Sequence, residues 1–102
     1  MFVEIAKRRI EVFSNLNSYL DRIKQSVLKT DPHSELYLFG SVAKGTGNMA
    51  SDIDILVITE LNRDNIQMVL DREGIGFPFE FHIRNRETAE PYFRHVNELK
   101  RL

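Results

Sequence analysis

The chain contains no cysteine, and no apolar run in it approaches the roughly 18 residues that a membrane-spanning helix needs. Without cysteine, the protein can form neither a disulfide nor a thiolate metal site, which suits the cytosol. The charged start, MFVEIAKRRIEVF, is not typical of a signal peptide. We therefore expect a soluble, cytoplasmic protein that does not have a membrane as partner.

An excess of one charge is also absent, because 14 Lys and Arg residues stand against 15 Asp and Glu residues, for a formal net charge of −1. Strong non-specific nucleic-acid binding rests on a surplus of basic residues, so nucleic acid is not an expected partner. Internal repeats, low-complexity segments and linkers are absent too. A chain of 102 residues, 42% of them hydrophobic, can form one modest core, and we expect residues 1–102 to be a single domain.

Residues from about Phe2 to Lys29 have the pattern of an amphipathic helix. Apolar side chains recur at spacings of three and four, and Asp31-Pro32 ends the pattern. One unbroken helix would be about 40 Å long at 1.5 Å per residue, which is longer than a domain of this size is wide. Either its first turns overhang the domain, or the helix breaks near Ser14 or Asn15, each of which can cap a shorter helix.

An overhanging start would leave apolar side chains free to pack against a second copy of the chain or a partner protein. These side chains are Phe2, Val3, Ile5, Ile10 and Val12. The basic run Lys7-Arg8-Arg9 lies among them and lacks interleaved aromatic residues. We interpret it as a solvated helical face.

The most informative stretch runs from Leu38 to Ile58, LFGSVAKGTGNMASDIDILVI. An apolar strand over Glu35–Phe39 meets a tight turn at Gly40. If a helical turn begins at Ser41, its free backbone N–H groups and hydroxyl form a site for phosphate oxygens, which Gly40 allows to approach the backbone. Further glycines let the loop fold back into a return strand that begins near Asp52.

The return strand carries two carboxylates on one face. Alternation places Asp52, Asp54, Leu56 and Ile58 on one side, and Ile53, Ile55 and Val57 on the other. Neighbouring carboxylates repel each other unless a cation lies between them, and such a pair is suited to Mg²⁺ or Mn²⁺. The stretch therefore predicts a phosphate site that faces a metal site.

Gly40-Ser41, Gly45 and Ser51-Asp52-Ile53-Asp54-Ile55 resemble the signature of the DNA polymerase β-type nucleotidyltransferases, in particular their minimal, single-domain members, the MNT proteins. The resemblance spans residues 35 to 83, about half the chain. It implies metal-dependent transfer of a nucleoside monophosphate from a nucleoside triphosphate. Asp52 and Asp54 would then be metal ligands, and Gly40 and Ser41 would contact the β and γ phosphates.

That family uses a third carboxylate from a later strand, and Glu80 is the candidate here. Within the segment Phe77–Ile83, alternation puts the aromatic residues on one face and Glu80 and His82 on the other. A charge in so aromatic a strand needs a metal or a water-exposed edge, and a solvent-facing glutamate is the alternative. For His82, a hydrogen-bonded structural role is more common than a catalytic one.

Two positions depart from the family pattern. Many relatives carry arginines shortly after the Gly-Ser pair, where this chain has Val42 and Lys44. Lys44 can supply a point charge to a triphosphate but not a bidentate contact, and a solvated loop lysine is the alternative. Ser51 and Asn48 suit hydrogen bonds that shape the loop. We include Lys44 and Ser51 among the candidate nucleotide-binding residues.

After the return strand, Asn62 is placed to cap a helix over Arg63–Arg72, and Gly74 ends that helix. A crossover helix of this kind makes the strands before and after it parallel. The three candidate carboxylates, all early in their strands, would then lie at one end of the sheet. This geometry supports the metal site independently of the resemblance.

The last segment predicts a helix from about Thr88 or Pro91 to Leu102, with Pro91 in its first turn and Tyr92, Val96 and Leu99 on one face. The expected fold is α/β (α+β), in the order α-β-α-β-α-β-α. Its small mixed sheet has three or more strands, the first antiparallel to the second and the second parallel to the third, and the long N-terminal helix and later helices pack on it.

By resemblance, Asp52, Asp54 and Glu80 would hold two Mg²⁺ or Mn²⁺ ions, and an acceptor hydroxyl would attack the α-phosphate of ATP or another nucleoside triphosphate and release pyrophosphate. Minimal members often occur as the antitoxin of a toxin–antitoxin pair, with a helical HEPN partner to which they add AMP, and this is the expected context. The alternatives are a protein-binding module with weak or lost activity, and transfer to RNA or to a small molecule.

Overall fold

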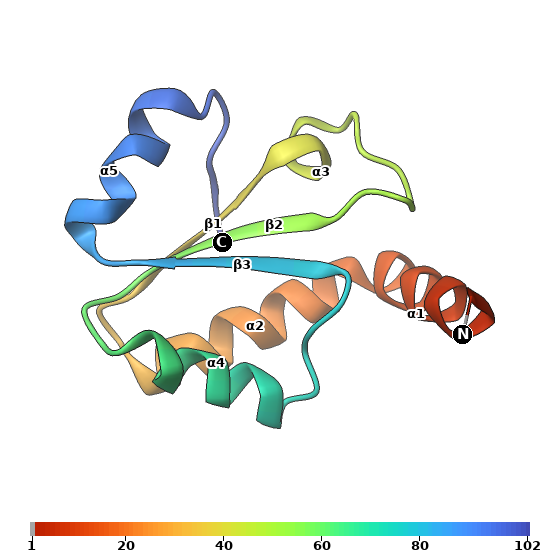
Figure 1. Ribbon diagram of the computed structural model, residues 1–102, viewed down its shortest axis with the longest axis horizontal. Helices are drawn as coiled ribbons and strands as arrows, with labels where there is room; N and C mark the ends of the chain where they lie inside the picture. Colours follow the sequence, from red (N-terminus) through yellow and green to blue (C-terminus); the bar gives the residue numbers. More distant parts are fainter. Residues whose placement is uncertain (1) are drawn as a thin grey trace.

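The computed structural model describes residues 2–102, so that Met1, the first residue of the predicted domain, lies outside the described part. Within this part, helices pack on a four-stranded sheet of order β3-β2-β1-β4 (Figure 1). The strands are β1 (Glu35–Phe39), β2 (Ile53–Ile58), β3 (Phe79–Arg84) and β4 (Lys100–Arg101). The helices are α1 (Phe2–Ser14), α2 (Leu16–Thr30), α3 (Gly40–Lys44), α4 (Arg63–Arg72) and α5 (Arg86–His95).

The central strands confirm the predicted mixed sheet. β1 is antiparallel to β2, with Phe39 opposite Asp54, and β2 is parallel to β3, with Asp54 beside Glu80. Helix α4 is the crossover between the parallel strands, and Asn62 caps it by accepting the backbone N–H of Asp64 at 2.9 Å. The first residues of β2 and β3 therefore lie at the same end of the sheet.

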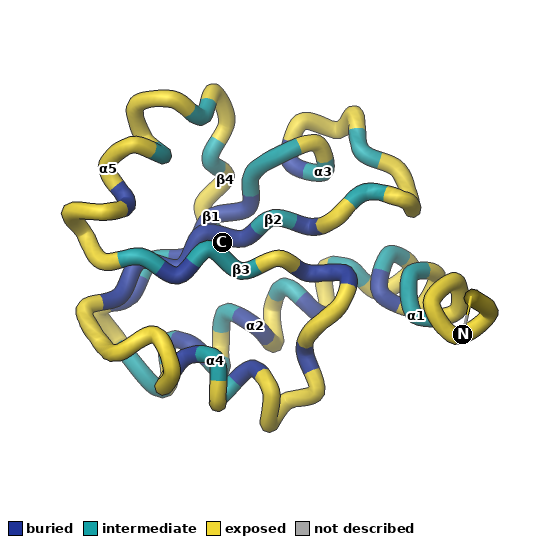
Figure 2. Tube along the Cα trace, in the orientation of Figure 1, coloured by how far each residue is buried: buried dark blue, intermediate teal, exposed yellow. Residues whose placement is uncertain are grey.

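Alternation along β2 separates two cores. Ile53, Ile55 and Val57 are fully buried in a core shared with α1, α2 and α4, whereas Leu56 packs with Ala89 of α5 on the opposite face. Figure 2 shows buried residues along the strands and on α2 and α4. Full burial of one such aliphatic side chain contributes about 1.5–3 kcal/mol. The sheet is thus fixed between two layers, and so are the side chains at the ends of its strands.

The predicted N-terminal helix breaks at Asn15, so the chain forms the two helices α1 and α2 here and not one long helix. The Asn15 N–H donates to the carbonyl of Val12 at 3.1 Å, and its side chain donates to the carbonyl of Glu11 at 2.8 Å. These bonds close the last turn of α1 and compete with continuation of the helix. Figure 1 shows α1 projecting beyond the layer that α2 and α4 form beneath the sheet.

Most of the apolar residues that were predicted to be accessible on α1 are exposed. Phe2, Val3 and Ile10 are 87%, 62% and 53% exposed. Val12 is fully buried, so the prediction is wrong for this residue, because the last turn of α1 packs into the core with α2. Among residues 2–102, we find no helix with both the length and the apolar character needed to cross a membrane.

The last segment differs from the prediction, because α5 ends at His95 and the chain then forms β4 instead of continuing as helix to Leu102. A capping box sets the start of α5: the Asn85 side chain accepts the N–H of Thr88, and the Thr88 hydroxyl accepts the N–H of Asn85. Pro91 therefore lies inside the helix, not in its first turn. Beyond α5, antiparallel pairing with β1 supplies the hydrogen bonds that a longer helix would have made.

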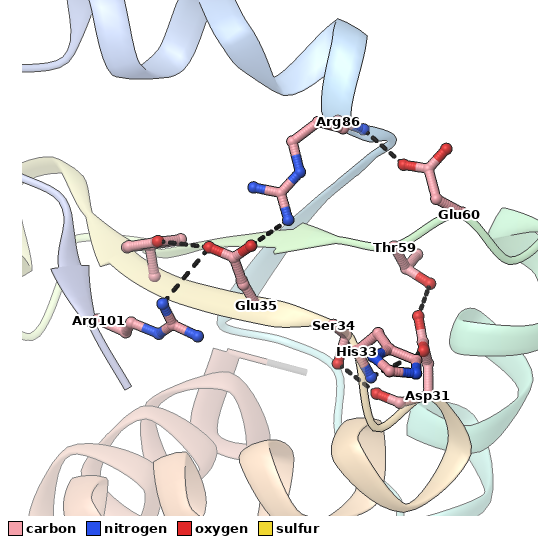
Figure 3. Close-up of polar contacts among 9 residues, drawn as sticks. Asp31, His33, Ser34, Glu35, Thr59, Glu60, Arg86 and Arg101 are labelled. Carbon is pink, nitrogen blue, oxygen red and sulfur yellow. Dashed lines mark hydrogen bonds and ion pairs between the residues drawn. The ribbon is translucent and has the colours of Figure 1, made fainter.

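A polar network ties α5 and β4 to the start of β1 (Figure 3). The Glu35 carboxylate pairs with the guanidinium of Arg86, lies 3.5 Å from Arg101 and accepts the Tyr37 hydroxyl at 2.8 Å. The Arg86 hydrogen bond, followed by that of Tyr37, holds the pKa of Glu35 below its ordinary value. The backbone N–H of Arg86 also donates to Glu60 at 2.8 Å. This network fixes the first turn of α5 against the sheet.

We predict that Asn85→Ala destabilises the protein by about 1 kcal/mol, because it leaves the N–H of Thr88 without its capping acceptor. Asn17→Ala, at an exposed position of α2, is the matched control and is expected to cause no loss, since alanine is the better helix former. Urea unfolding followed by circular dichroism measures both variants. Equal stability of the two variants would contradict the assigned capping box.

Candidate functional site

Three polar side chains meet where β2 and β3 begin, on the α5 side of the sheet. Asp54 lies beside Glu80 in the parallel register, and His82 follows two residues later on the same face. His82 Nε2 lies 3.5 Å from Asp54 Oδ1 and 3.8 Å from Glu80 Oε1. One ligand atom from each of the three side chains lies within 4.8 Å of the others. The structure thus brings Asp54 and Glu80 together and adds His82 to them.

Aromatic neighbours hold the imidazole of His82. Its Nδ1 atom forms a 2.9 Å hydrogen bond with the Tyr92 hydroxyl, and the Phe39 ring meets it edge-on, with ring centroids 4.9 Å apart. Its Nε2 atom is buried and has no hydrogen-bond partner within residues 2–102. A polar atom buried without a hydrogen bond costs about 1–3 kcal/mol, and a ligand bound to Nε2 between the Asp54 and Glu80 carboxylates would offset that cost.

Gly40 brings the turn after β1 against Asp54. Its φ is +80°, and a Cβ built at this position would lie 2.4 Å from Asp54 Oδ2, so any other residue would strain the backbone and displace this carboxylate. Gly40 is also the first residue of the short helix α3, which carries the exposed residues Ser41 and Lys44. Gly45 ends α3 with a φ of +77°. The predicted phosphate-binding turn therefore lies against the carboxylate of Asp54.

The loop between α3 and β2 is closed by its own polar groups. Ser51 Oγ accepts the N–H of Asn48 at 3.0 Å, and Asn48 Oδ1 accepts the N–H of Ala50 at 2.8 Å. The N–H of Gly47 donates to the carbonyl of Ser41 at 2.9 Å. Ser51 and Asn48 thus shape the loop as expected, and a contact of Ser51 with nucleotide stays a prediction.

Asp52 lies outside the group formed by the other three side chains. Its side chain is 55% exposed and lies 3.5 Å from Arg9 of α1. Arg9 also donates to the carbonyls of Met49 and Ser51, at 3.1 and 2.8 Å, and its guanidinium lies 4.6 Å from the ring centroid of Phe77. Arg9 therefore attaches α1 to the loop that precedes β2.

The interpretation of the basic run as a solvated helical face holds for the exposed Lys7 but is wrong for Arg8 and Arg9. Arg8 donates to the carbonyls of Gly74 and Phe77, at 2.9 and 3.2 Å. The partners of both arginines lie 40 or more positions away along the chain, with the exception of Tyr19. No local pattern in the sequence reveals such contacts, and the same is true of the bond between Tyr92 and His82.

Burial raises the pKa of Asp54 above its ordinary value of 3.8, and the negative charges of Glu80 and Asp52 add to this rise. The interaction with His82 acts in the opposite direction and lowers the pKa. The ionised form of Asp54 is therefore held at a cost in the folded protein. A cation bound beside it would remove that cost.

The donor set fits a divalent cation. Two carboxylates and one imidazole are common ligands of such ions, and here their ligand atoms converge within 4.8 Å. The unpaired Nε2 of His82, which faces both carboxylates, supports the fit independently. The exposed hydroxyl and ammonium groups of Ser41 and Lys44, on the adjoining helix, are suited to phosphate oxygens.

Comparison with known proteins gives the following relationships. The sequence profile of the nucleotidyltransferase domain matches residues 20–101. A crystal structure assigned as a nucleotidyltransferase is similar over 82% of this chain and 97% of its own, with 27% sequence identity and a TM-score of 0.67. A second crystal structure with that assignment, from Sulfolobus solfataricus, covers 97% of this chain and 83% of its own, with 22% identity and a TM-score of 0.56, and shows the fold alone. No curated protein matches significantly.

We predict that Gly40→Ala weakens Mn²⁺ binding at least about tenfold, because the new methyl group displaces the Asp54 carboxylate. Gly45→Ala is the matched control: it introduces the same backbone strain, about 1–2 kcal/mol, with no atom within 4 Å of the new Cβ. Calorimetric titration measures binding, and urea unfolding measures stability. If both variants bind Mn²⁺ equally well, contact between Gly40 and Asp54 does not shape the site.

We predict that Asp54→Asn stabilises the metal-free protein by roughly 0.5–1 kcal/mol at pH 7. Because the pKa of Asp54 is raised on folding, the folded state binds more protons than the unfolded state, and stability falls as pH rises from 3.8 through the raised value. The gain from the variant should therefore shrink as pH falls through 3.8 to about 2.8, where the wild-type carboxyl is largely protonated in both states. Urea unfolding across this pH range, with Asp21→Asn as an exposed control, measures the effect; a gain that grows toward low pH would contradict it.

Proposed function

Because this chain belongs to the nucleotidyltransferase domain family, we propose that it transfers a nucleoside monophosphate, AMP from ATP in the first instance, to an acceptor hydroxyl. The observation that carries the proposal is the convergence of Asp54, Glu80 and His82 beside the Gly40 turn. The turn supplies phosphate-binding groups and the strands supply cation ligands. A nucleoside triphosphate with its divalent cation needs both.

Ser41 and Lys44 are the proposed triphosphate contacts. They lie three residues apart on α3, hence on the same side of that short helix, and both are exposed. The Ser41 hydroxyl can donate to a phosphate oxygen, and Lys44 supplies a positive charge where pyrophosphate leaves. Gly40 leaves room for the phosphates to approach the backbone.

Asp52, Asp54 and Glu80 are the proposed ligands of Mg²⁺ or Mn²⁺, which would polarise the α-phosphate and lower the pKa of the acceptor hydroxyl. Glu80, whose side chain is 59% exposed, can accept the proton of that hydroxyl. The acceptor oxygen forms the new bond to the α-phosphorus, and the bond to the β-phosphate oxygen breaks, so that pyrophosphate is released.

The pairing of Asp52 with Arg9 does not oppose this role. The ion pair is exposed on the Asp52 side, and exposed pairs contribute only about 0–1 kcal/mol. Cation binding can therefore separate the two groups at small cost. Arg9 would remain attached to the loop through the carbonyls of Met49 and Ser51.

The proposed acceptor is a partner protein, and the exposed apolar residues of α1 support this choice. Phe2, Val3, Ile5 and Ile10 are exposed on the helix whose Arg9 borders the site. The near-neutral charge disfavours RNA, and a small-molecule acceptor needs more enclosure than one open sheet end offers. An AMP-adding antitoxin with a HEPN-type partner fits these features.

The same exposed residues favour a second candidate, a protein-binding module with weak or lost activity, in which α1 contacts the partner or a second copy of the chain. The two candidate functions differ in whether they require the carboxylates of Asp52 and Asp54. Neutralising Asp52 and Asp54 should abolish transfer but leave binding through α1 intact.

We predict that the full chain, incubated with α-³²P-ATP and Mg²⁺ or Mn²⁺ in a lysate of its source cells, labels a discrete macromolecule. An Asp52→Asn, Asp54→Asn double variant should lower labelling at least about 100-fold, since the metal contribution is worth several kcal/mol. Protease and nuclease sensitivity of the product identify the acceptor class.

The control is an Asp21→Asn, Asp71→Asn double variant, which removes the same charge from exposed positions of α2 and α4 and should label normally. The enzyme hypothesis fails if the wild-type chain forms neither a labelled macromolecule nor a nucleotide–small-molecule product while a partner still co-purifies. The binding-module function would then replace it.

A further inference from the structure

We propose that His82 is a direct nitrogen ligand of the cation held by Asp54 and Glu80, and that this ligand makes the site selective for Mn²⁺ or another transition-metal ion over Mg²⁺. Tyr92 acts as the positioning residue that orients the imidazole. The inference rests on the proposed function, which it deepens by naming the class of metal.

The separations among the three side chains suit shared coordination better than hydrogen bonding. His82 Nε2 lies 3.5 Å from Asp54 Oδ1 and 3.8 Å from Glu80 Oε1. Ordinary N–H···O bonds are about 2.7–3.2 Å long, so both contacts are too long. Two ligands that each lie about 2.1–2.2 Å from one ion are roughly 3.0–3.6 Å apart at octahedral to tetrahedral angles. The 3.5 Å separation lies within that range and the 3.8 Å separation slightly above it, so a small movement of the exposed Glu80 side chain would complete the coordination.

The two ring nitrogens of His82 differ in their hydrogen-bond partners, as is expected of a histidine that binds a metal ion through one nitrogen. Nδ1 has a partner in the Tyr92 hydroxyl, whereas the buried Nε2 has none within residues 2–102. A histidine with a structural role only is expected to have partners for both buried nitrogens. The unpaired atom is the one that faces Asp54 and Glu80, so the lone pair available to a cation lies between two anionic ligands.

Tyr92 fixes both the tautomer and the orientation of the ring. When Nε2 binds a cation, Nδ1 carries the proton and donates to the Tyr92 oxygen 2.9 Å away, which is the arrangement that outer partners of metal-bound histidines commonly adopt. The Phe39 ring contacts His82 and Tyr92 edge-on, at centroid distances of 4.9 and 5.6 Å. The imidazole therefore has little freedom to rotate away from the carboxylates.

The nitrogen ligand sets the metal preference. Mg²⁺ prefers oxygen ligands and retains several of its waters, whereas an imidazole ligand favours first-row transition-metal ions, among which Mn²⁺ gains the least. A set of two carboxylates and one imidazole thus discriminates against Mg²⁺. A set of three carboxylates would not.

The test is pulsed EPR of Mn²⁺ added in equimolar amount to the full chain. We expect ¹⁴N coupling in the wild-type spectrum and its replacement by ¹⁵N coupling when the chain is grown with [¹⁵N]histidine. His82→Gln should remove the coupling and weaken Mn²⁺ binding about tenfold or more, with far less effect on Mg²⁺. Tyr92→Phe should retain the coupling but weaken Mn²⁺ binding about tenfold.

His95→Gln, at the exposed end of α5, is the matched histidine control and should leave the spectrum unchanged. The isotope exchange in the wild-type chain shows that the ligand is a histidine, and because the chain has three histidines, unchanged coupling in both His33→Gln and His95→Gln assigns it to His82 even if His82→Gln does not fold. Bound Mn²⁺ without nitrogen coupling overturns the inference, as does a His82→Gln variant whose losses for Mn²⁺ and Mg²⁺ are equal.

Failure of this inference differs from failure of the proposed function. If Mn²⁺ binding depends on Asp54 and Glu80 but shows no nitrogen coupling, His82 is not a ligand and the nucleotidyltransferase proposal stands. If neither ion binds, and Asp54→Asn and Glu80→Gln change nothing, the metal site of the proposed function itself is refuted.

Discussion

Parallel pairing of β2 with β3 sets Asp54 directly beside Glu80, and most other features of the site are consequences of that register. Like charges on neighbouring strand positions repel, and partial burial of Asp54 increases the cost of its ionisation. The repulsion persists because the rest of the sheet cannot shift. A displacement of β3 by one residue would move Phe79 and Ile83 out of the core and is therefore prevented by hydrophobic burial.

Asp54 is confined from other directions as well. The backbone of Gly40 lies so close that a Cβ there would contact the carboxylate, and His82, fixed by Tyr92 and Phe39, lies on the other side. Five elements, β1, α3, β2, β3 and α5, thus position one side chain, and each of them is fixed by core residues away from the site. Contacts within the fold therefore hold the side chains of the site, which limits the entropy that ligand binding must remove.

Local signals explain which parts of this arrangement could be predicted from the sequence. Alternation placed Asp54 and Glu80 on the faces where they lie, and Asn62 and Gly74 marked the limits of α4, because such signals act within a few residues. The sequence could not decide whether the helix breaks at Asn15, because the apolar spacing of three and four continues on both sides of this residue. Strand β4 was missed because two exposed edge residues carry no alternation.

Contacts between segments that are distant in the chain could not be predicted from local sequence patterns. Arg9 shows this most clearly, because as one of three consecutive basic residues on an exposed helix it has the sequence signature of a solvated side chain. Its bonds to Met49 and Ser51 depend on the orientation of α1 relative to α2, which the break at Asn15 sets. The exposed apolar residues of α1 are thus attached, through Arg9, to the loop that carries Asp52. A protein bound to α1 would lie beside the end of the sheet where Asp54 and Glu80 meet, which is where the proposed transfer would need an acceptor hydroxyl.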